Sequence, residues 1–70
     1  MSINVNLKAG RKFKSTPLGF DIIIKITKLD LLHNELSVEY LSRIGQKMED
    51  VWNLEHCIWA FERGEYILID

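Results

Sequence analysis

Alternation of apolar and polar residues predicts β-strands along much of the chain before residue 53. The clearest case is the segment FDIIIKITKLD, in which every even position from Phe20 to Ile26 is apolar and three of these residues are β-branched isoleucines. Asp21 and Lys25 lie on the opposite face of this predicted strand. Ile23 shares that polar face, so it needs a cover from elsewhere in the molecule or from a partner.

Shorter patterns complete a predicted sheet. Residues 36–44, LSVEYLSRI, alternate in the same way, with Leu41 out of pattern. EDVW at residues 49–52 predicts a paired strand, and EYILID at the end of the chain predicts the last one. The Pro17-Leu18-Gly19 segment predicts a turn, because proline presets its own φ and glycine accepts a positive one.

Residues 1–8 also alternate and predict an extra N-terminal strand, which could pair with the sheet edge of another subunit. The rest, residues 9–70, is predicted to form a small barrel. We found no repeat, linker or low-complexity segment in the 70 residues, so residues 1–70 are predicted to be a single domain.

Residues 54–63 are predicted to form one short helix before the last strand. Asn53 is a favourable N-cap, and Gly64 stands where a left-handed residue ends a helix. The helical period places four apolar residues on one stripe that faces the core; they are Leu54, Cys57, Ile58 and Phe61.

Trp59 lies off this stripe, beside acidic and basic residues of the same helix, whereas Trp52 at a strand end is predicted to be core. Two explanations stay open for Trp59. Either another part of the chain, such as the N-terminal strand, covers it, or it belongs to an interface. The candidate protein interface consists of Trp59, Glu55, Glu62, Arg63, Ile23 and Leu41.

The size of the chain favours self-association. A 70-residue domain buries only about 60% of its unfolded surface, and ordering it costs on the order of 100 kcal/mol. Small domains gain stability from disulfides, metals or partner subunits, and the single cysteine, Cys57, cannot form an intrachain disulfide. We therefore expect a homo-oligomer.

Charge is unevenly distributed along the chain. Residues 1–28 carry six basic residues and one acidic residue, while residues 29–70 carry three basic and nine acidic ones. If the fold separates these halves, the molecule is a dipole that can pair with its own copies or present its basic side to an anion. If the strands interleave, part of the asymmetry becomes cross-strand charge pairing.

The basic cluster KAGRKFK is a candidate anion site. Arg11, Lys12 and Lys14 surround Phe13, so they could hold a small anionic ligand such as a nucleotide, or phosphates of single-stranded nucleic acid with one base stacked on the ring. A sequence pI of about 6.1 and the acidic second half argue against a long polyanion. Alternatively, these lysines only protect a solvated edge strand from aggregation.

Catalytic, metal and membrane sites are not predicted. His56 and Cys57 point to different sides of the helix, so they cannot act as base and nucleophile, and a buried Cys57 behaves as a small apolar residue. One cysteine and two distant histidines show no metal-ligand spacing, and we expect no cofactor. The longest uncharged run, residues 1–7, contains two asparagines, so we expect a cytoplasmic protein with no membrane span.

From GRKFKST through VWNLEHCIWAFERGEYILI, residues 9 to 69 resemble small SH3-like barrel proteins of phages and prophages. In those proteins an aromatic residue ends a strand and is followed by a short helix and a GEY-type return strand. The resemblance implies a mainly β fold: a partly open antiparallel barrel of about five strands, with one short helix before the last. It also implies a binding role, in which compact phage proteins block host enzymes or defence systems, some by sequestering a nucleotide signal.

Overall fold

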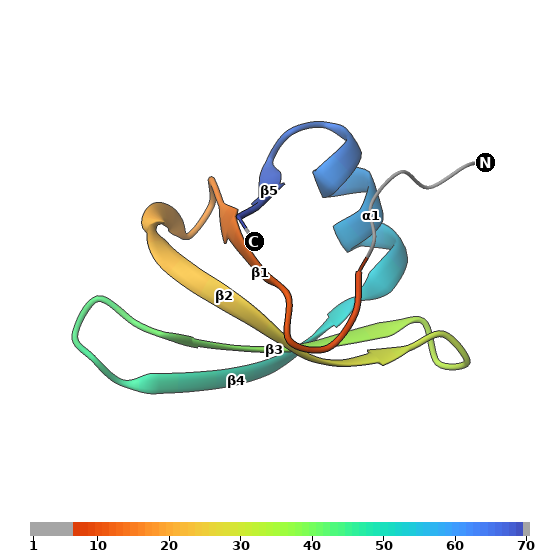
Figure 1. Ribbon diagram of the computed structural model, residues 1–70, viewed down its shortest axis with the longest axis horizontal. Coiled ribbons are helices and arrows are strands. Elements are labelled where there is room, and N and C mark those ends of the chain that lie inside the picture. The colour runs from red at the N-terminus through yellow and green to blue at the C-terminus, as the bar shows by residue number, and fades with distance from the viewer. Residues whose placement is uncertain (1–6, 70) are drawn as a thin grey trace.

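The computed structural model describes residues 7–69, which form five strands and one helix (Figure 1). The elements follow in the order β1 (Lys12–Ser15), β2 (Gly19–Asp30), β3 (Glu35–Leu41), β4 (Lys47–Asn53), α1 (Leu54–Glu62) and β5 (Tyr66–Leu68). The expected fold class is confirmed: the protein is mainly β, all strand pairs are antiparallel, and one short helix precedes the last strand.

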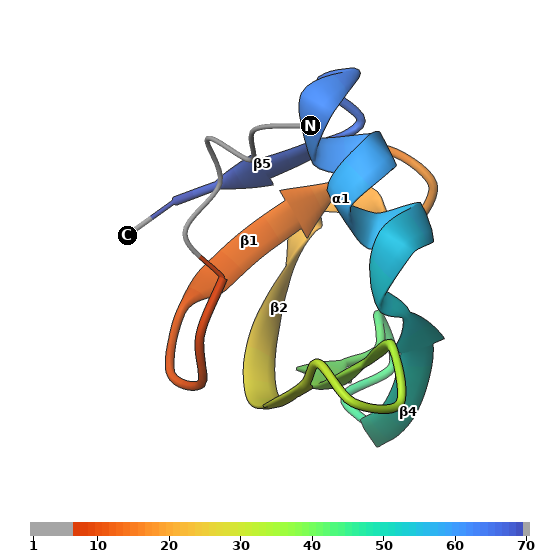
Figure 2. The ribbon, with the colours of Figure 1, turned by 90° about the vertical axis from the view of Figure 1, so that its right-hand side faces the viewer.

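All five strands belong to one open sheet with the order β4-β3-β2-β1-β5. The 12-residue strand β2 pairs with β1 along its first half and with β3 along its second half. The sheet bends, so that β1 and β5 lie above the β3–β4 hairpin and α1 stands beside them (Figure 2). Strands β4 and β5 are the two edges of the sheet.

The core lies inside this bend and is built from alternating strand residues and one side of the helix. Its fully buried side chains are Phe13, Ile24, Ile26, Leu36, Val38, Cys57 and Ser15. The expected inward face of β2 is confirmed from Ile22 to Ile26, but Phe20 is 49% exposed. The ladder between β1 and β2 is irregular between Phe13 and Ser15, whose partners are Ile24 and Gly19, and Phe20 lies in this irregular part of β2.

The end of β3 differs from expectation. Strand β3 ends at Leu41, and Ile44 is 86% exposed in a turn closed by the Gly45 N–H, which donates to the Ser42 carbonyl at 2.9 Å. Gly45 takes the positive φ of 82° that this turn requires. Most of the predicted N-terminal strand, residues 1–6, lies outside the described residues, and Leu7 and Lys8 are not in a strand.

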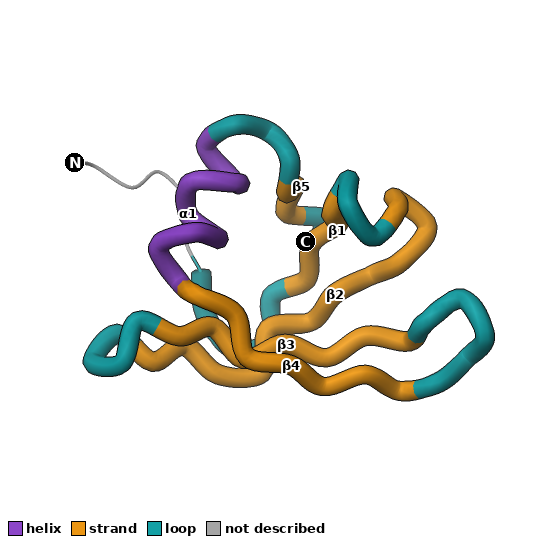
Figure 3. The backbone as a smooth tube through the Cα atoms, turned by 180° about the vertical axis from the view of Figure 1, so that it is seen from behind, coloured by secondary structure: helices purple, strands orange, loops and turns teal. Residues whose placement is uncertain are grey.

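The helix begins and ends at the expected signals and follows β4 directly (Figure 3). The Asn53 side chain accepts a hydrogen bond from the His56 N–H at 2.8 Å. At the other end, Arg63 is the C-cap, and Gly64 with a φ of 82° donates its N–H to the Phe61 carbonyl at 3.1 Å. These hydrogen bonds set the first and last residues of the helix.

Candidate functional site

Trp59 lies on the side of α1 that faces away from the core. Its side chain is 48% exposed, whereas the inner side of the helix is buried at Leu54, Cys57, Ala60 and Phe61. The ring is not part of the buried core cluster or of the partly buried residues packed on it. The helical period thus predicted correctly that this tryptophan lies off the apolar stripe.

Two neighbours on the helix surface hold the Trp59 ring in place. The Arg63 guanidinium carbon lies 4.3 Å from the ring centroid, in a cation–π contact. The Arg63 Nε is in turn 3.1 Å from the Glu65 Oε2. The His56 ring packs at 5.8 Å between centroids, with an interplanar angle of 41°. The exposed indole is therefore oriented by side chains rather than by burial.

A shallow hollow runs along this side of the helix. The residues that line it are Asn53, Glu55, His56, Ile58, Trp59 and Glu62. Glu55 and Glu62 lie one turn on either side of Trp59, and within residues 7–69 no basic side chain forms an ion pair with either carboxylate. We call Glu55, Ile58, Trp59 and Glu62 the Trp59 face.

Ile58 is a member of this face that sequence reasoning assigned to the core. It is half-buried, packs against the core cluster and also lines the hollow. The signal was present in the helical period, because Ile58 lies at the edge of the apolar stripe nearest to Glu55 and Glu62. A residue at such an edge can pack on the core and line the surface hollow at the same time.

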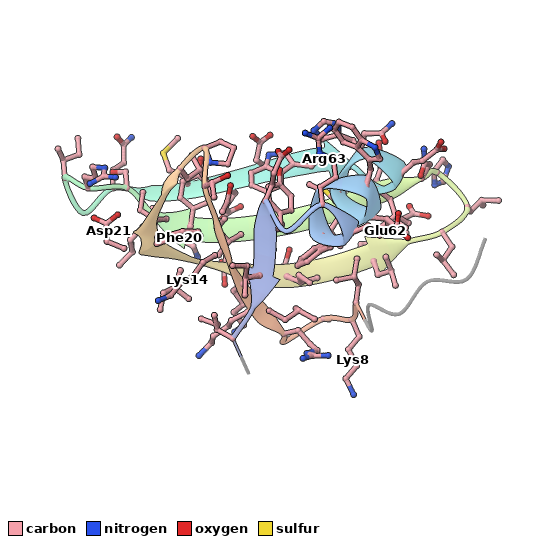
Figure 4. The ribbon with its side chains drawn as sticks, turned by 90° about the horizontal axis from the view of Figure 1, so that it is seen from above. Lys8, Lys14, Phe20, Asp21, Glu62 and Arg63 are labelled. Atoms are coloured by element: carbon pink, nitrogen blue, oxygen red, sulfur yellow. The ribbon has the colours of Figure 1, made fainter. Side chains whose placement is uncertain are left out.

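The six predicted interface residues do not form one surface. Ile23 and Leu41 are exposed by 48% and 62%, and they line the same hollows on the outer face of β2 and β3. Figure 4 shows the neighbouring Asp21 near one end of the molecule, and Glu62 and Arg63 at the helix in the other half. The fold therefore separates the Ile23 and Leu41 pair from the Trp59 face.

The predicted anion site is corrected at its aromatic residue. Phe13 is fully buried, and its ring centroid lies 5.0 Å from that of Phe61 and 5.2 Å from that of Tyr66. It cannot stack on a ligand, because alternation along β1 turns it into the core and turns Lys12 and Lys14 outward. Arg11 precedes the strand and is half-buried. Lysines without an exposed ring lack the stacking surface that the sequence pattern indicated.

Cys57 has the environment of a structural residue. Its side chain has no exposed surface, and burial raises the pKa of the thiol to about 11. At neutral pH the group is therefore a protonated thiol, which is a poor nucleophile. His56, next to it in sequence, is exposed on another side of the helix.

Among residues 7–69, no three His, Cys, Asp or Glu side chains are grouped as a metal site would need. No helix in the same range is long and apolar enough to cross a membrane. Comparison of the chain with protein-family models, curated proteins and solved structures found no match.

Proposed function

We propose that this chain is a non-enzymatic cytoplasmic protein that binds another protein through the Trp59 face. The observation that carries the proposal is the state of Trp59, which is 48% exposed and yet oriented by Arg63 and His56. A ring that is already held in position loses little conformational freedom when a partner covers it. Tryptophan is also among the residues that most often dominate binding energy at interfaces.

The charges around the ring indicate the chemistry of the partner. Glu55 and Glu62 flank Trp59 and have no basic partner among the described residues, and Ile58 is the apolar residue that lines the hollow beside them. The one cation at the ring, Arg63, is paired with Glu65, so the charge around Trp59 is mainly acidic. A partner segment with an apolar side chain between basic ones is complementary to this face. We therefore propose a basic, partly apolar protein surface as the ligand.

The resemblance to phage-encoded barrels adds a direction to the proposal. If the chain acts on a host, the partner is a bacterial protein whose activity is blocked when its basic surface is covered. Blocking of this kind requires binding but no catalytic group, and the Trp59 face can provide it.

The test is a quantitative capture experiment followed by reconstitution. Immobilised wild-type protein, Trp59→Ala and the control Leu32→Ala are exposed to the same bacterial lysate; Leu32 is 89% exposed in the β2–β3 turn, outside the Trp59 face. A partner retained by the wild type and the control is purified and titrated by calorimetry. We expect Trp59→Ala to weaken binding by roughly 30-fold or more, the usual effect at an interface hot spot.

Two results would contradict the proposal. Equal binding by Trp59→Ala and the wild type would place the partner elsewhere on the molecule. Native mass spectrometry that shows a small anionic molecule retained by the purified protein, and lost in Lys12→Glu with Lys14→Glu, would favour ligand sequestration instead.

A further inference from the structure

The two edges of the sheet differ in length. Strand β5 is three residues long, which leaves little backbone for another chain to pair with, whereas β4 has seven residues, six of them exposed. An exposed edge strand carries unpaired N–H and C=O groups that can pair with a strand of another copy. The backbone of β4 is therefore the edge of this sheet that is more open to strand pairing.

The hydrogen bonds at its two ends show which backbone groups of β4 point to the free edge. The Ser42 N–H donates to the Gln46 carbonyl at 2.8 Å just before β4, and the Leu54 N–H donates to the Asn34 carbonyl at 2.9 Å just after it. Bonded pairs alternate with non-bonded ones along an antiparallel ladder, and the register of β3 with β4 has no irregularity. The residues whose backbone groups face the free edge are therefore Lys47, Glu49, Val51 and Asn53.

Asp50 covers one of these outward groups with its own carboxylate. Its Oδ1 accepts the Val51 N–H at 2.9 Å, so a donor close to the middle of β4 is already taken from within the chain. Its Oδ2 accepts the Trp52 indole N–H at 2.9 Å, and this second bond holds the carboxylate in place. An added strand would have to break the bond between Asp50 and Val51 before it could use that donor.

Asp50 also lies at the centre of the longest pairing that β4 can make with another β4. An antiparallel pair that aligns all seven residues of both strands has its two-fold axis at Asp50. Glu49 would lie opposite Val51 of the other copy, so their outward backbone groups would bond. Met48 would lie opposite Trp52 of the other copy. At the axis two Asp50 residues would face each other as a non-bonded pair, with Cα atoms only about 4.5 Å apart, and like charges directly opposite destabilise a strand pair.

We propose that Asp50 keeps the β4 edge from pairing with a second copy of this chain. It acts in two ways: its carboxylate occupies the Val51 donor, and its charge opposes the symmetric register. Without Asp50, the same register would bring Met48 of each copy beside Trp52 of the other, which favours pairing. The proposal does not depend on partner binding at the Trp59 face, because it concerns the edge of the sheet and not α1.

Three variants separate the two effects in sedimentation analysis. Asp50→Ala frees the Val51 donor and removes the charge, so it should self-associate at least roughly tenfold more strongly than the wild type. Asp50→Asn removes the charge but keeps an oxygen that can accept the Val51 N–H, so it should self-associate less than Asp50→Ala. Glu49→Ala is the matched control and should behave like the wild type, because this neighbouring exposed carboxylate pairs with Lys47 rather than with an edge N–H.

A second substitution shows whether the β4 backbone is the contact. Val51→Pro removes the outward N–H without removing a bond to β3, and proline is tolerated in edge strands where the N–H would face solvent. Asp50→Ala combined with Val51→Pro should therefore return to the association state of the wild type. Circular dichroism checks that every variant is folded.

Amide hydrogen exchange tests the contact in the wild type itself. The Val51 N–H should exchange more slowly than the Glu49 N–H, which also faces the edge and is left to solvent. The proposal is overturned if these two amides exchange alike, if Asp50→Ala self-associates no more than the wild type, or if Glu49→Ala self-associates as strongly as Asp50→Ala. It is also overturned if adding Val51→Pro leaves the association of Asp50→Ala unchanged, because the contact would then lie elsewhere.

Discussion

Trp52 and Trp59 stand at the end of β4 and in the helix that follows it, but they are held in different ways. Trp52 is half-buried, with its ring centroid 6.2 Å from that of Phe13 and 6.0 Å from that of Tyr66. Its indole N–H donates to the Asp50 Oδ2 at 2.9 Å. Within residues 7–69, the aromatic and cation–π contacts of the Trp59 ring are with two exposed side chains, His56 on the same helix and Arg63 at its C-cap.

This difference separates a residue that packs on the core from one that the fold leaves on the surface. Core rings around Trp52 lose packing when it is removed, whereas the surroundings of Trp59 are already solvated. Both residues are the same chemical group in the same short stretch of sequence. Their surroundings, and not their type, therefore decide what each contributes.

The largest expected effect comes from truncating the two tryptophans in turn. Trp52→Ala should lower the free energy of unfolding by about 3 kcal/mol, because it leaves a cavity among the aromatic rings. Trp59→Ala should change it by about 0.5 kcal/mol or less, since the ring lies outside the core cluster. Urea denaturation measures both. A comparable loss in the two variants would show that Trp59 is a stabilising residue and would remove the distinction.

A smaller effect is expected at Asp50, which supports Trp52 from the edge strand. Its Oδ1 accepts the Val51 N–H and its Oδ2 accepts the Trp52 indole N–H, each at 2.9 Å. Asp50→Ala removes both acceptors and should cost about 1 kcal/mol in unfolding free energy. The matched control is Glu62→Ala, at an exposed carboxylate with no ion pair among the described residues. Equal stability of the two variants would show that these bonds contribute nothing measurable.

The smallest effect on stability at neutral pH is expected at Cys57, on the core-facing side of α1. Burial raises the pKa of Cys57 from its ordinary value of 9.0 to about 11, so between these values the unfolded chain loses the thiol proton before the folded one does. Stability should be unaffected at pH 7 and should fall as the pH rises from about 9 towards 11. Urea denaturation across this range should give a shallower decline for Cys57→Ala.

Stability should still decline somewhat with rising pH in Cys57→Ala, because the pKa of Tyr66 is also raised, mainly by burial. Parallel curves for the wild type and the variant would mean that the thiol is not as shielded in solution as in the structure. Trp59→Ala should leave the slope unchanged, since it alters the opposite side of the helix.

Local sequence patterns predicted most of the architecture. The alternation around Ile24 and the caps Asn53 and Gly64 depend on residues close together in the chain, so their signals can be read without the fold. Both phenylalanines of the first hairpin differ from what the pattern indicated. The candidate anion site required an exposed Phe13, which is core, while Phe20 was placed on the inward face of its strand and is 49% exposed. Alternation along β1 buries Phe13, whereas Phe20 lies in the part of β2 where the pairing with β1 is irregular.

The sequence by itself determined the elements of this protein: the strands, the turn before β2, the capped helix and the position of Trp59 off its apolar stripe. These follow from backbone preferences and from periods of two and 3.6 residues, which act over short stretches. Only the tertiary structure decided that Ile23 and Leu41 are neighbours, that they lie apart from Trp59, and that Asp50 lies on a free edge of the sheet. These relations depend on strand register, because pairing brings together residues that are distant in the chain.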